Sequence, residues 1–322
     1  TTILPKIISA AHSLGTQYWH HRDISQKHID IRTAYEPGTE PKNAKWSLLP
    51  WSGPVKRLDL NLQISELFDQ FITEDPASVL SHPYTLMLLA ERSQQTGTFP
   101  RNLKTALSFG EALSPTIRKA LEDIWNVQVI DSYSANEIGI IAIQCPETEN
   151  LHVRVENVKV EVLDEHGQPC LPGTIGKVVI TTLHNFASPL IRYEIGDFAE
   201  VGGRCSCGRN LPVRTRILGR HRNLCVLKSG ERFFPEIRAE LEKFSQIRQF
   251  QAHQKSLEDI DLRVVSVRPF TDGEKEEIQA LIQKKLHFPF NVEVIEVEDI
   301  PRAANGKFEE FMSEIPEARI DS

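Results

Sequence analysis

Hydrophobic positions recur at helical spacing through "SELFDQFITEDPASVLSHPYTLMLLAERSQQ", residues 65–95. This spacing predicts helical structure with one apolar face. Pro83 can begin a helix after the preceding turn, because its fixed φ suits the first helical position. We therefore expect a helix that starts at Pro83.

A strand and a helix follow in "LKTALSFGEALSPTIRKALEDIW". The apolar run predicts a short strand that ends in a turn at Gly110 and Glu111. Ser114 stands at the N-cap position of the next helix, and Pro115 occupies its first turn. The following stretch, "VQVIDSYSANEIGIIAIQC", has a strand–turn–strand pattern. Alternation of this kind favours a sheet covered by helices.

The middle of the chain is rich in strand patterns. Two strands are expected in 158–183, around turns that contain Gly and Pro, and two more in 188–201. After Gly219 the pattern changes to a mixture of short helices and strands: a helix in 235–244, strands in 247–254 and 261–269, a charged amphipathic helix in 272–286 and a strand in 291–300.

These patterns predict an α/β protein of two domains, since a single core stops growing near roughly 250–300 residues and the chain has 322. The first, residues 1–219, is a large α/β region with a β-rich subdomain. The second, residues 220–322, is a small, mobile α+β domain of about 100 residues. We expect the hinge between them near 220–222.

Composition narrows the function classes. The net charge of −7 argues against nucleic acid or an anionic membrane as the main partner. No apolar stretch reaches the roughly 18–20 residues of a membrane span. The N-terminal stretch lacks the features of a signal peptide, and because it begins abruptly we expect that the front of a longer protein is missing. These features predict a cytoplasmic protein. A homodimer is one of the oligomeric states left open.

Five cysteines, an odd number, favour a reducing compartment over a disulfide scaffold. Cys170 and Cys225 have apolar neighbours and are interpreted as core thiols. Isolated histidines such as His20 and His21 are interpreted as surface groups.

The remaining cysteines form a candidate metal site. "RCSCGR" places Cys205 and Cys207 on a knuckle flanked by glycines, and "QCPETENLHV" supplies Cys145 and His152. Three cysteines and one histidine are a preferred ligand set for a closed, structural Zn²⁺ site. The alternative is three scattered thiols and a surface histidine. In a true site, a carboxylate or another histidine could replace His152.

The tail contains "PRAANGK", in which Lys307 follows an Asn-Gly pair. Asn-Gly is a strong hairpin signal, and a lysine beside such a turn is usually solvated. A functional interpretation requires other residues that could use a mobile cation.

Such residues occur in order along the chain, in "DSYSANEIG" (131–139), "RYEIGD" (192–197) and "LGRHRN" (218–223), followed by "PRAANGK" (301–307). Together they resemble the core motifs of the adenylate-forming superfamily of acyl-CoA synthetases, peptide-synthetase adenylation domains and luciferases. The resemblance is strongest to the phenylacetate–CoA ligase branch, including its capsular-biosynthesis-like relatives, which carries a similar Cys-x-Cys-Gly-Arg knuckle.

The resemblance implies ATP and Mg²⁺ as cofactors, with coenzyme A as the acceptor and a small carboxylic acid as the substrate. Tyr133 would lie against adenine, Asp197 would accept hydrogen bonds from the ribose hydroxyls, and Glu137 would hold Mg²⁺. Lys307 would approach the α-phosphate as a point charge, where Gly306 allows close backbone approach. The other implied nucleotide-binding residues are Asn136, Arg220, Gly110 and Glu111.

Individually, these residues have other interpretations: Tyr133 as a packed aromatic, Glu137 as a turn carboxylate and Asp197 as a surface acceptor. The chain also departs from the family pattern. Asn136 replaces the usual Thr or Ser, although its amide can still donate to a phosphate, and Arg222 stands at the hinge position where many relatives have Asp or Lys.

The family's Ser/Thr/Gly-rich phosphate loop does not occur in these residues, and its backbone donors would otherwise cradle the phosphates. It could precede Thr1, come from another chain, or be absent from a degenerate relative.

The sequence therefore predicts an AMP-forming acid–thiol ligase. The alternatives are an adenylating enzyme that transfers the acyl group to a carrier protein or an amine, and a catalytically silent remnant that binds a nucleotide or a partner. By family analogy the acyl pocket lies near 82–84, 108–110 and 132–135, where Ser132, Ser134 and Ala135 leave room for an aryl or medium-sized acid.

Overall fold

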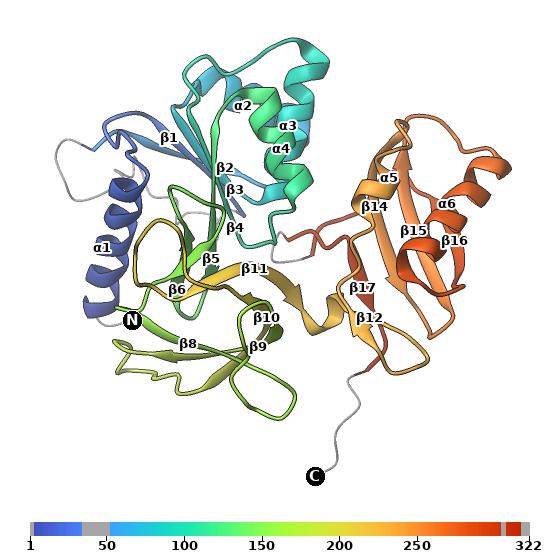
Figure 1. The fold of residues 1–322 in the computed structure, drawn as a ribbon. Helices are drawn as coiled ribbons and strands as arrows, with labels where there is room; N and C mark the ends of the chain where they lie inside the picture. The colour runs from blue at the N-terminus through green and yellow to red at the C-terminus, as the bar shows by residue number, and fades with distance from the viewer. Residues whose placement is uncertain (1–2, 34–51, 304–306, 317–322) are drawn as a thin grey trace. The chain divides into compact units, whose positions relative to one another are not determined.

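The computed structural model describes residues 3–33, 52–303 and 307–316. The chain divides into two compact units, Thr1–Leu218 and Gly219–Ser322. The first combines helices with a large sheet and the second has its own sheet, which confirms the predicted α/β class (Figure 1). Among the described residues, no helix is both long and apolar enough to cross a membrane.

The first unit is built on an eleven-stranded sheet of order β2-β1-β3-β4-β5-β6-β7-β11-β10-β9-β8. Five neighbouring strands are parallel. In sheet order they are β2 (Val55–Asp59), β1 (His28–Arg32), β3 (Ser78–Ser81), β4 (Thr105–Phe109) and β5 (Gln128–Ala135). The strand direction reverses between β5 and β6, so a short hairpin turn stands at the carboxyl end of the parallel region.

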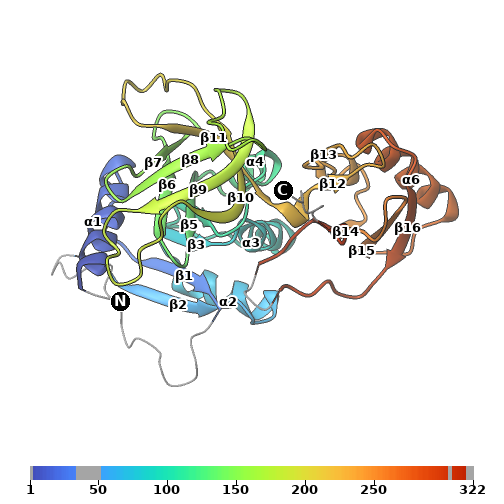
Figure 2. The ribbon, with the colours of Figure 1, turned by 90° about the horizontal axis from the view of Figure 1, so that it is seen from below.

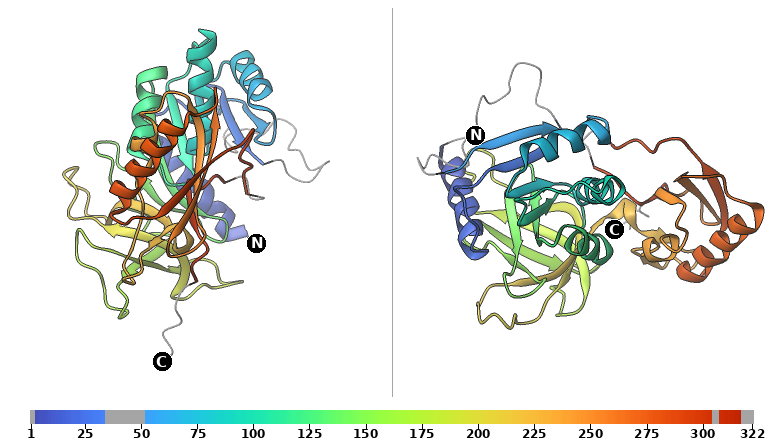
Figure 3. Two further views of the ribbon diagram at one scale, coloured as in Figure 1. Left: turned by 90° about the vertical axis from the view of Figure 1, so that its right-hand side faces the viewer. Right: turned by 90° about the horizontal axis from the view of Figure 1, so that it is seen from above.

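Three helices cover one face of this parallel region, and the end of helix α1 reaches the other (Figures 2 and 3). One face packs on helices α2 (Ile64–Glu74), α3 (Pro83–Thr96) and α4 (Pro115–Trp125). Because strand side chains alternate between faces, Val79 and Ala106 point to these helices while Leu80 and Leu107 point the other way. Trp19, the last residue of helix α1 (Ile3–Trp19), packs on that second face.

The predicted start of α4 is confirmed. Ser114 has extended backbone angles, and its side chain accepts a hydrogen bond from the N–H of Ile117. Pro115 is the first helical residue, where its missing N–H costs nothing. Pro83 begins α3 in the same way.

The rest of the large sheet is antiparallel and encloses its own apolar core, which includes Ile141, Val178 and Ile180. Its strands are β6 (Gly139–Gln144), β7 (Leu151–Val153), β8 (Val158–Leu163), β9 (Ile175–Thr182), β10 (Tyr193–Val201) and β11 (Val213–Arg220). The prediction of two strands within 188–201 is wrong, since only β10 forms. Pro189 cannot donate to a ladder, and Arg192 has a left-handed φ of 49° that interrupts extended structure.

The second unit contains a four-stranded sheet of order β16-β15-β14-β17 and a small hairpin, β12-β13. Its core includes Leu262, Ile278 and Phe290, all fully buried. The elements are the 3-10 helix η1 (His221–Asn223), β12 (Cys225–Val226), β13 (Arg232–Phe233), α5 (Arg238–Leu241), β14 (Ile247–Gln254), β15 (Asp259–Ser266), α6 (Asp272–Leu286), β16 (Asn291–Glu296) and β17 (Phe311–Ser313). Helix α6 has the predicted bounds, with a capping box between Thr271 and Glu274.

Several elements differ from the sequence predictions. The region 65–95 holds β3 between two helices, because α2 ends at Asp75 in a left-handed conformation before Pro76. Helix α1 and strands β1, β2, β7, β11, β12, β13 and β17 were not predicted, and the helix expected in 235–244 is only the short α5. His20 is buried rather than at the surface, since it hydrogen-bonds to a backbone carbonyl in the sheet, whereas His21 is exposed. Cys225 is fully buried as predicted, but Cys170 is only half-buried.

Candidate functional site

Two of the predicted nucleotide-binding residues meet at the reversal of strand direction. Tyr133 lies in β5 and is buried, and its hydroxyl donates to Asp197 Oδ2 in β10 at 2.7 Å. Asp197 follows Gly196, whose φ of 82° lies at an irregularity in the β9–β10 ladder. This bulge re-aims the strand and lets its carboxylate reach an aromatic residue 64 positions away.

Asn136 and Glu137 form the exposed turn between β5 and β6. The N–H of Ile138 closes the turn by donating to the carbonyl of Ala135 at 3.2 Å, and Gly139 follows with a φ of 86°. An exposed carboxylate on a short turn can bind a hydrated cation without a large desolvation cost. The predicted role of Glu137 therefore remains a prediction that its exposure allows.

Behind this turn lies a buried polar network that the sequence analysis missed. Gln144 Oε1 accepts from Arg118 Nη2 at 2.8 Å and from the N–H of Asp131 at 2.9 Å. The Asp131 carboxylate accepts from the hydroxyl of Ser108 and from the N–H of Ser132. Burial raises the pKa of Asp131, although Ser108, Arg118 and Ser132 oppose the shift. The network holds in place the strand ends where the acyl pocket is predicted. Its members come from four different elements, so no pattern within one segment of the sequence predicts it.

The predicted turn at Gly110 and Glu111 lies at the carboxyl end of β4. Gly110 has a φ of 82°, and the Glu111 side chain is mostly buried, with an oxygen 3.8 Å from His82 Nδ1. The His82 ring stacks on the Phe109 ring, with their centroids 4.8 Å apart. The guanidinium of Arg32 also lies over the Phe109 ring, 4.7 Å from its centroid. Ligands of open parallel sheets bind at this edge, so these groups lie at the edge where the sequence analysis expects the acyl pocket, which remains a prediction.

Lys307, Arg220 and Arg222 belong to the second unit, whereas the other predicted nucleotide-binding residues belong to the first. The carbonyl of Lys307 accepts from the N–H of Ala303 at 3.0 Å. The Asn-Gly pair of the motif, including Gly306, lies outside the described residues. The approach of Lys307 to a nucleotide remains a prediction.

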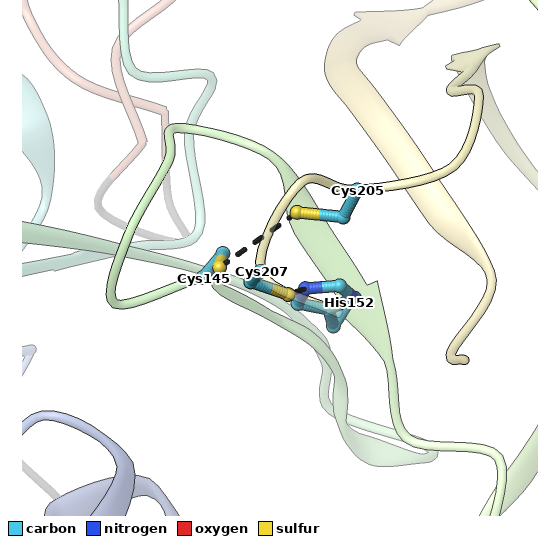
Figure 4. A group of neighbouring side chains, drawn as sticks. All are labelled: Cys145, His152, Cys205 and Cys207. Atoms are coloured by element: carbon cyan, nitrogen blue, oxygen red, sulfur yellow. Dashed lines mark hydrogen bonds between the residues drawn. The ribbon is translucent and has the colours of Figure 1, made fainter. Parts of the chain in front are cut away.

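The four predicted metal ligands come together in the first unit, and their side chains point toward one another (Figure 4). Cys145 follows β6, His152 lies in β7, and Cys205 and Cys207 belong to the connection between β10 and β11. Their ligand atoms all lie within 4.8 Å of one another. All but Cys207 are buried.

The distances suit a tetrahedral zinc ion. With bonds of about 2.3 Å to sulfur and 2.0–2.1 Å to nitrogen, tetrahedral ligands stand about 3.8 Å apart for two sulfurs and about 3.6 Å apart for sulfur and nitrogen. The Sγ atoms of Cys145 and Cys205 are 3.9 Å apart, and Cys207 Sγ is 3.3 Å from His152 Nε2. The donor set therefore fits Zn²⁺ in chemistry and in size.

The thiols differ in their tendency to ionise. Burial opposes ionisation of Cys205, but hydrogen bonds from Thr148, Cys207 and Asn150 outweigh it and lower the pKa of that thiol to about 6. Burial raises the pKa of Cys145. A metal binds the thiolate form, so Cys205 loses its proton to a metal more readily than Cys145.

Helix α1 is anchored beside this cluster, a contact that the sequence analysis missed. The Trp19 ring meets His152 edge-on at 5.9 Å and lies against the guanidinium groups of Arg154 at 4.5 Å and Arg209 at 5.0 Å. His20 Nε2 is 3.0 Å from the carbonyl of Gln144, the residue before Cys145. His152 Nδ1 is buried without a hydrogen-bond partner in the part of the chain that the structure describes.

Comparison with known proteins agrees with the predicted resemblance. Residues 236–314 match the family model described as the CapK C-terminal domain. A phenylacetate–coenzyme A ligase of Thermus thermophilus is 29% identical over 167 residues, which are 50% of this chain and 37% of that protein. The enzyme of the same name from Pseudomonas putida is 26% identical over 180 residues, 53% of this chain and 40% of the relative. The matches thus span less than half the length of these curated relatives.

Solved structures share the fold. A 2-hydroxyisobutyryl-CoA ligase in the postadenylation state has a TM-score of 0.75 at 19% identity, covering 95% of this chain and 69% of that one. An anthranilate CoA ligase in complex with anthranoyl-AMP has a TM-score of 0.68 at 15% identity, covering 92% and 61%. The sequence and structural matches together confirm the predicted resemblance to the adenylate-forming superfamily and to its phenylacetate–CoA ligase branch.

Proposed function

We propose that this relative of the phenylacetate–coenzyme A ligases activates a carboxylic acid with ATP and transfers the acyl group to a thiol. In the first half-reaction, a carboxylate oxygen attacks the α-phosphorus of ATP, which forms an acyl-adenylate and releases pyrophosphate. In the second, the thiolate of coenzyme A attacks the acyl carbon and AMP leaves. The observation that carries the proposal is the pairing of Tyr133 with Asp197, which comes from two separate motifs of the family.

In this proposal the paired residues bind the nucleoside. The aromatic ring of Tyr133 packs on adenine. The Asp197 carboxylate, which accepts a hydrogen bond from the Tyr133 hydroxyl, would instead accept hydrogen bonds from the ribose hydroxyls. A buried tyrosine that holds the carboxylate at 2.7 Å keeps it oriented before the nucleotide arrives. Glu137 would hold Mg²⁺, which neutralises phosphate charge when bound.

Lys307 would supply positive charge to the carboxylate and the α-phosphate during adenylate formation. Charge builds on the phosphate oxygens in that step, so a preorganised cation stabilises the transition state more than the ground state. The small second unit would carry this lysine to the site and away from it, as lids in other enzymes do.

The acid would bind at the carboxyl edge of the parallel strands. Ser132 donates its hydroxyl to the carbonyl of Ser108 at 2.8 Å, and the Ser108 hydroxyl donates to the Asp131 carboxylate. Both side chains are small and already hydrogen-bonded within the sheet, so they would leave room for the acid. His82 and Phe109 offer a stacked aromatic wall on the same edge. Such a wall suits an aryl or medium-sized acid.

Zn²⁺ at Cys145, His152, Cys205 and Cys207 would be structural in this proposal. All four positions are taken by protein side chains, so no open site remains for a water nucleophile. The ion would join the strand that follows the Tyr133–Glu137 hairpin to the connection that leads into β11.

The test is ATP–pyrophosphate exchange by the purified chain with a panel of aryl, hydroxy and short aliphatic acids. Exchange that depends on one class of acid is expected, followed by thioester formation with coenzyme A. Exchange without coenzyme A dependence, but with transfer to a carrier thiol or an amine, would support the second enzymatic function. Nucleotide binding with no exchange for any acid would contradict the proposal.

A further inference from the structure

Arg209 lies beside the knuckle that carries two of the predicted metal ligands. It comes just after Cys207 and Gly208, and Gly208 has a left-handed φ of 76°, which suits a tight turn. A hydrogen bond to Cys207 is the main reason that the pKa of the Arg209 guanidinium is raised, and the nearby Cys145 adds to the shift. The guanidinium is therefore in contact with the edge of the cluster.

The sulfurs of the other two cysteines accept hydrogen bonds from the connection between β6 and β7. These bonds run from the N–H of Glu147 to Cys145 Sγ at 3.4 Å and from Asn150 Nδ2 to Cys205 Sγ at 3.9 Å. Both donors are neutral. Cys207 is the least buried of the four predicted ligands, and its neighbour Arg209 brings a full positive charge to the most accessible sulfur.

A metal in this cluster would leave a negative charge to be balanced. Metal binding requires cysteine as thiolate and histidine in its neutral form, so three thiolates and one Zn²⁺ have one negative charge in excess. Such a charge is costly to bury unless a cation pairs with it. The Arg209 side chain is 35% exposed and can supply this cation. Its other ion-pair partner, Glu147 at 3.4 Å, is 59% exposed and competes weakly because water screens it.

The same guanidinium also contacts helix α1. Its carbon lies over the Trp19 ring, 5.0 Å from the centroid, which is within the range of a cation–π interaction. The Trp19 ring meets the ring of His152, a predicted ligand, edge-on at 5.9 Å. In the next residue, His20 Nε2 is 3.0 Å from the carbonyl of Gln144, which precedes Cys145. The end of α1 is therefore joined to the cluster by several contacts.

We propose that Arg209 is the charge partner of the metal cluster and that, through its contact with Trp19, metal binding holds the end of helix α1 on the large sheet. The inference rests on the zinc site of the proposed function but not on the ligase activity. A bound metal fixes the knuckle and gives Arg209 a permanent partner beside Trp19. Without the metal the knuckle loses its cross-link, and Arg209 loses that partner. Metal binding and the docking of α1 are thus coupled, so each strengthens the other.

The first experiment measures the zinc affinity of the full chain by competition with a chromophoric chelator. Arg209→Gln removes the positive charge and is expected to weaken zinc binding about 10- to 100-fold, the range typical for loss of a group that supports a metal ligand. Arg209→Lys keeps the charge and should recover most of the loss. If Arg209→Gln binds zinc as tightly as the unsubstituted chain, the proposal is wrong.

Arg204 provides a matched control. It stands on the other side of the same knuckle, is exposed, and donates to Asn210 Oδ1 at 3.1 Å. Arg204→Gln removes the same charge from the same loop and should leave the zinc affinity unchanged. A loss equal to that of Arg209→Gln would attribute the effect to the overall charge of the loop and would overturn the specific role of Arg209.

Cobalt tests the contact at the sulfur itself. Co²⁺ accepts the same thiolate and imidazole ligands, and its thiolate-to-metal charge-transfer absorption reports the electron density on the sulfurs. Removing a cationic donor raises the energy of the sulfur electrons. The band should therefore move to longer wavelength in Arg209→Gln and stay in place in Arg204→Gln. An identical band in these two variants and the unsubstituted chain would show that Arg209 does not act on the ligands.

Hydrogen exchange tests whether the metal holds α1. Removal of zinc from the unsubstituted chain should lower the protection of the amides of 16–20, and Arg209→Gln should lower it even with zinc at saturating concentration. The amides of α2, which packs on the opposite face of the sheet, should keep their protection. Unchanged protection of 16–20 after removal of zinc would contradict the coupling.

The coupling must also act in the other direction. Trp19→Ala should weaken zinc binding about fivefold or more, whereas Tyr18→Ala, at a neighbouring side chain that is 82% exposed, should not. Equal zinc affinity in Trp19→Ala and the unsubstituted chain would overturn the proposal. If the unsubstituted chain binds no zinc, the zinc site and this inference fail together. Inactivity with every acid would instead remove the ligase proposal and leave these measurements to decide the role of Arg209.

Discussion

Replacing Cys205 with serine should remove the metal and destabilise the first unit. The cluster joins residues that are distant in sequence, since Cys145 and Cys205 are 60 positions apart. A cross-link that closes a loop of this length restricts the unfolded chain by about 4 kcal/mol in the chain-entropy model. For a unit of this size, each kcal/mol corresponds to about 2–4 °C in Tm, so Cys205→Ser should lower Tm by about 10 °C.

The assay combines elemental analysis with thermal unfolding of protein purified without chelator. The unsubstituted chain should contain about one zinc per chain, because the donor set forms a closed site. Addition of chelator should lower its Tm towards that of Cys205→Ser and should have little effect on the variant itself. Cys170→Ser is the control, because Cys170 is a half-buried thiol in the same unit that is not part of the cluster.

Three results would refute this reasoning. Zinc content well below one per chain would show that the four side chains meet without binding an ion. Full zinc content with unchanged Tm after chelation would show that the ion does not restrain the chain. A lower Tm for Cys170→Ser equal to that of Cys205→Ser would attribute the loss to packing instead.

Four further predictions concern single side chains. Lys307→Ala should abolish most adenylate formation but spare thioester formation from supplied adenylate, and equal losses in the two rates would exclude the proposed role. Asp197→Ala should raise the KM for ATP strongly in pyrophosphate exchange, because ribose hydroxyls would lose their acceptor; an unchanged KM would argue against the nucleoside site. Glu137→Gln should shift the magnesium titration of the same assay to higher concentration, and a superimposable titration would remove Glu137 from the metal. His28 is buried and hydrogen-bonded to Ser78, and burial holds its pKa well below 6.5. The folded protein therefore loses stability as the pH falls below 6.5, because the unfolded chain binds a proton at His28 that the folded chain does not. His28→Gln should flatten this decline of Tm between pH 6.5 and 4.5.

The sequence predicted elements with local signals. Ser114 and Pro115 marked the start of α4 because capping chemistry is confined to adjacent residues. The same holds for α6, where a capping box fixes the start. The meeting of Cys145 and His152 with the knuckle was predictable because ligand chemistry, rather than spacing, identified the members.

Features that depend on distant contacts were not predictable. Gln144 reads as an ordinary strand residue, but its amide joins Arg118 to the backbone of Asp131. Trp19 gives no signal that its ring will pack against the guanidinium groups of two arginines far along the chain. In both cases tertiary structure supplies the partner, and no pattern within one segment contains that information.

The anchoring of helix α1 has a consequence for how the chain folds during synthesis. Its hydrogen bond from Arg154 to Thr16 spans 138 residues, and that from His20 to the Gln144 carbonyl spans 124. At about 5–20 residues per second, a ribosome needs about 7–28 s to make a segment of that length. During this time α1 has none of these partners, and the apolar ring of Trp19 is available to chaperones or to other nascent chains. Contacts this distant also raise the contact order of the first unit, so we expect it to fold more slowly than the second, whose β14–β15 pairing is local.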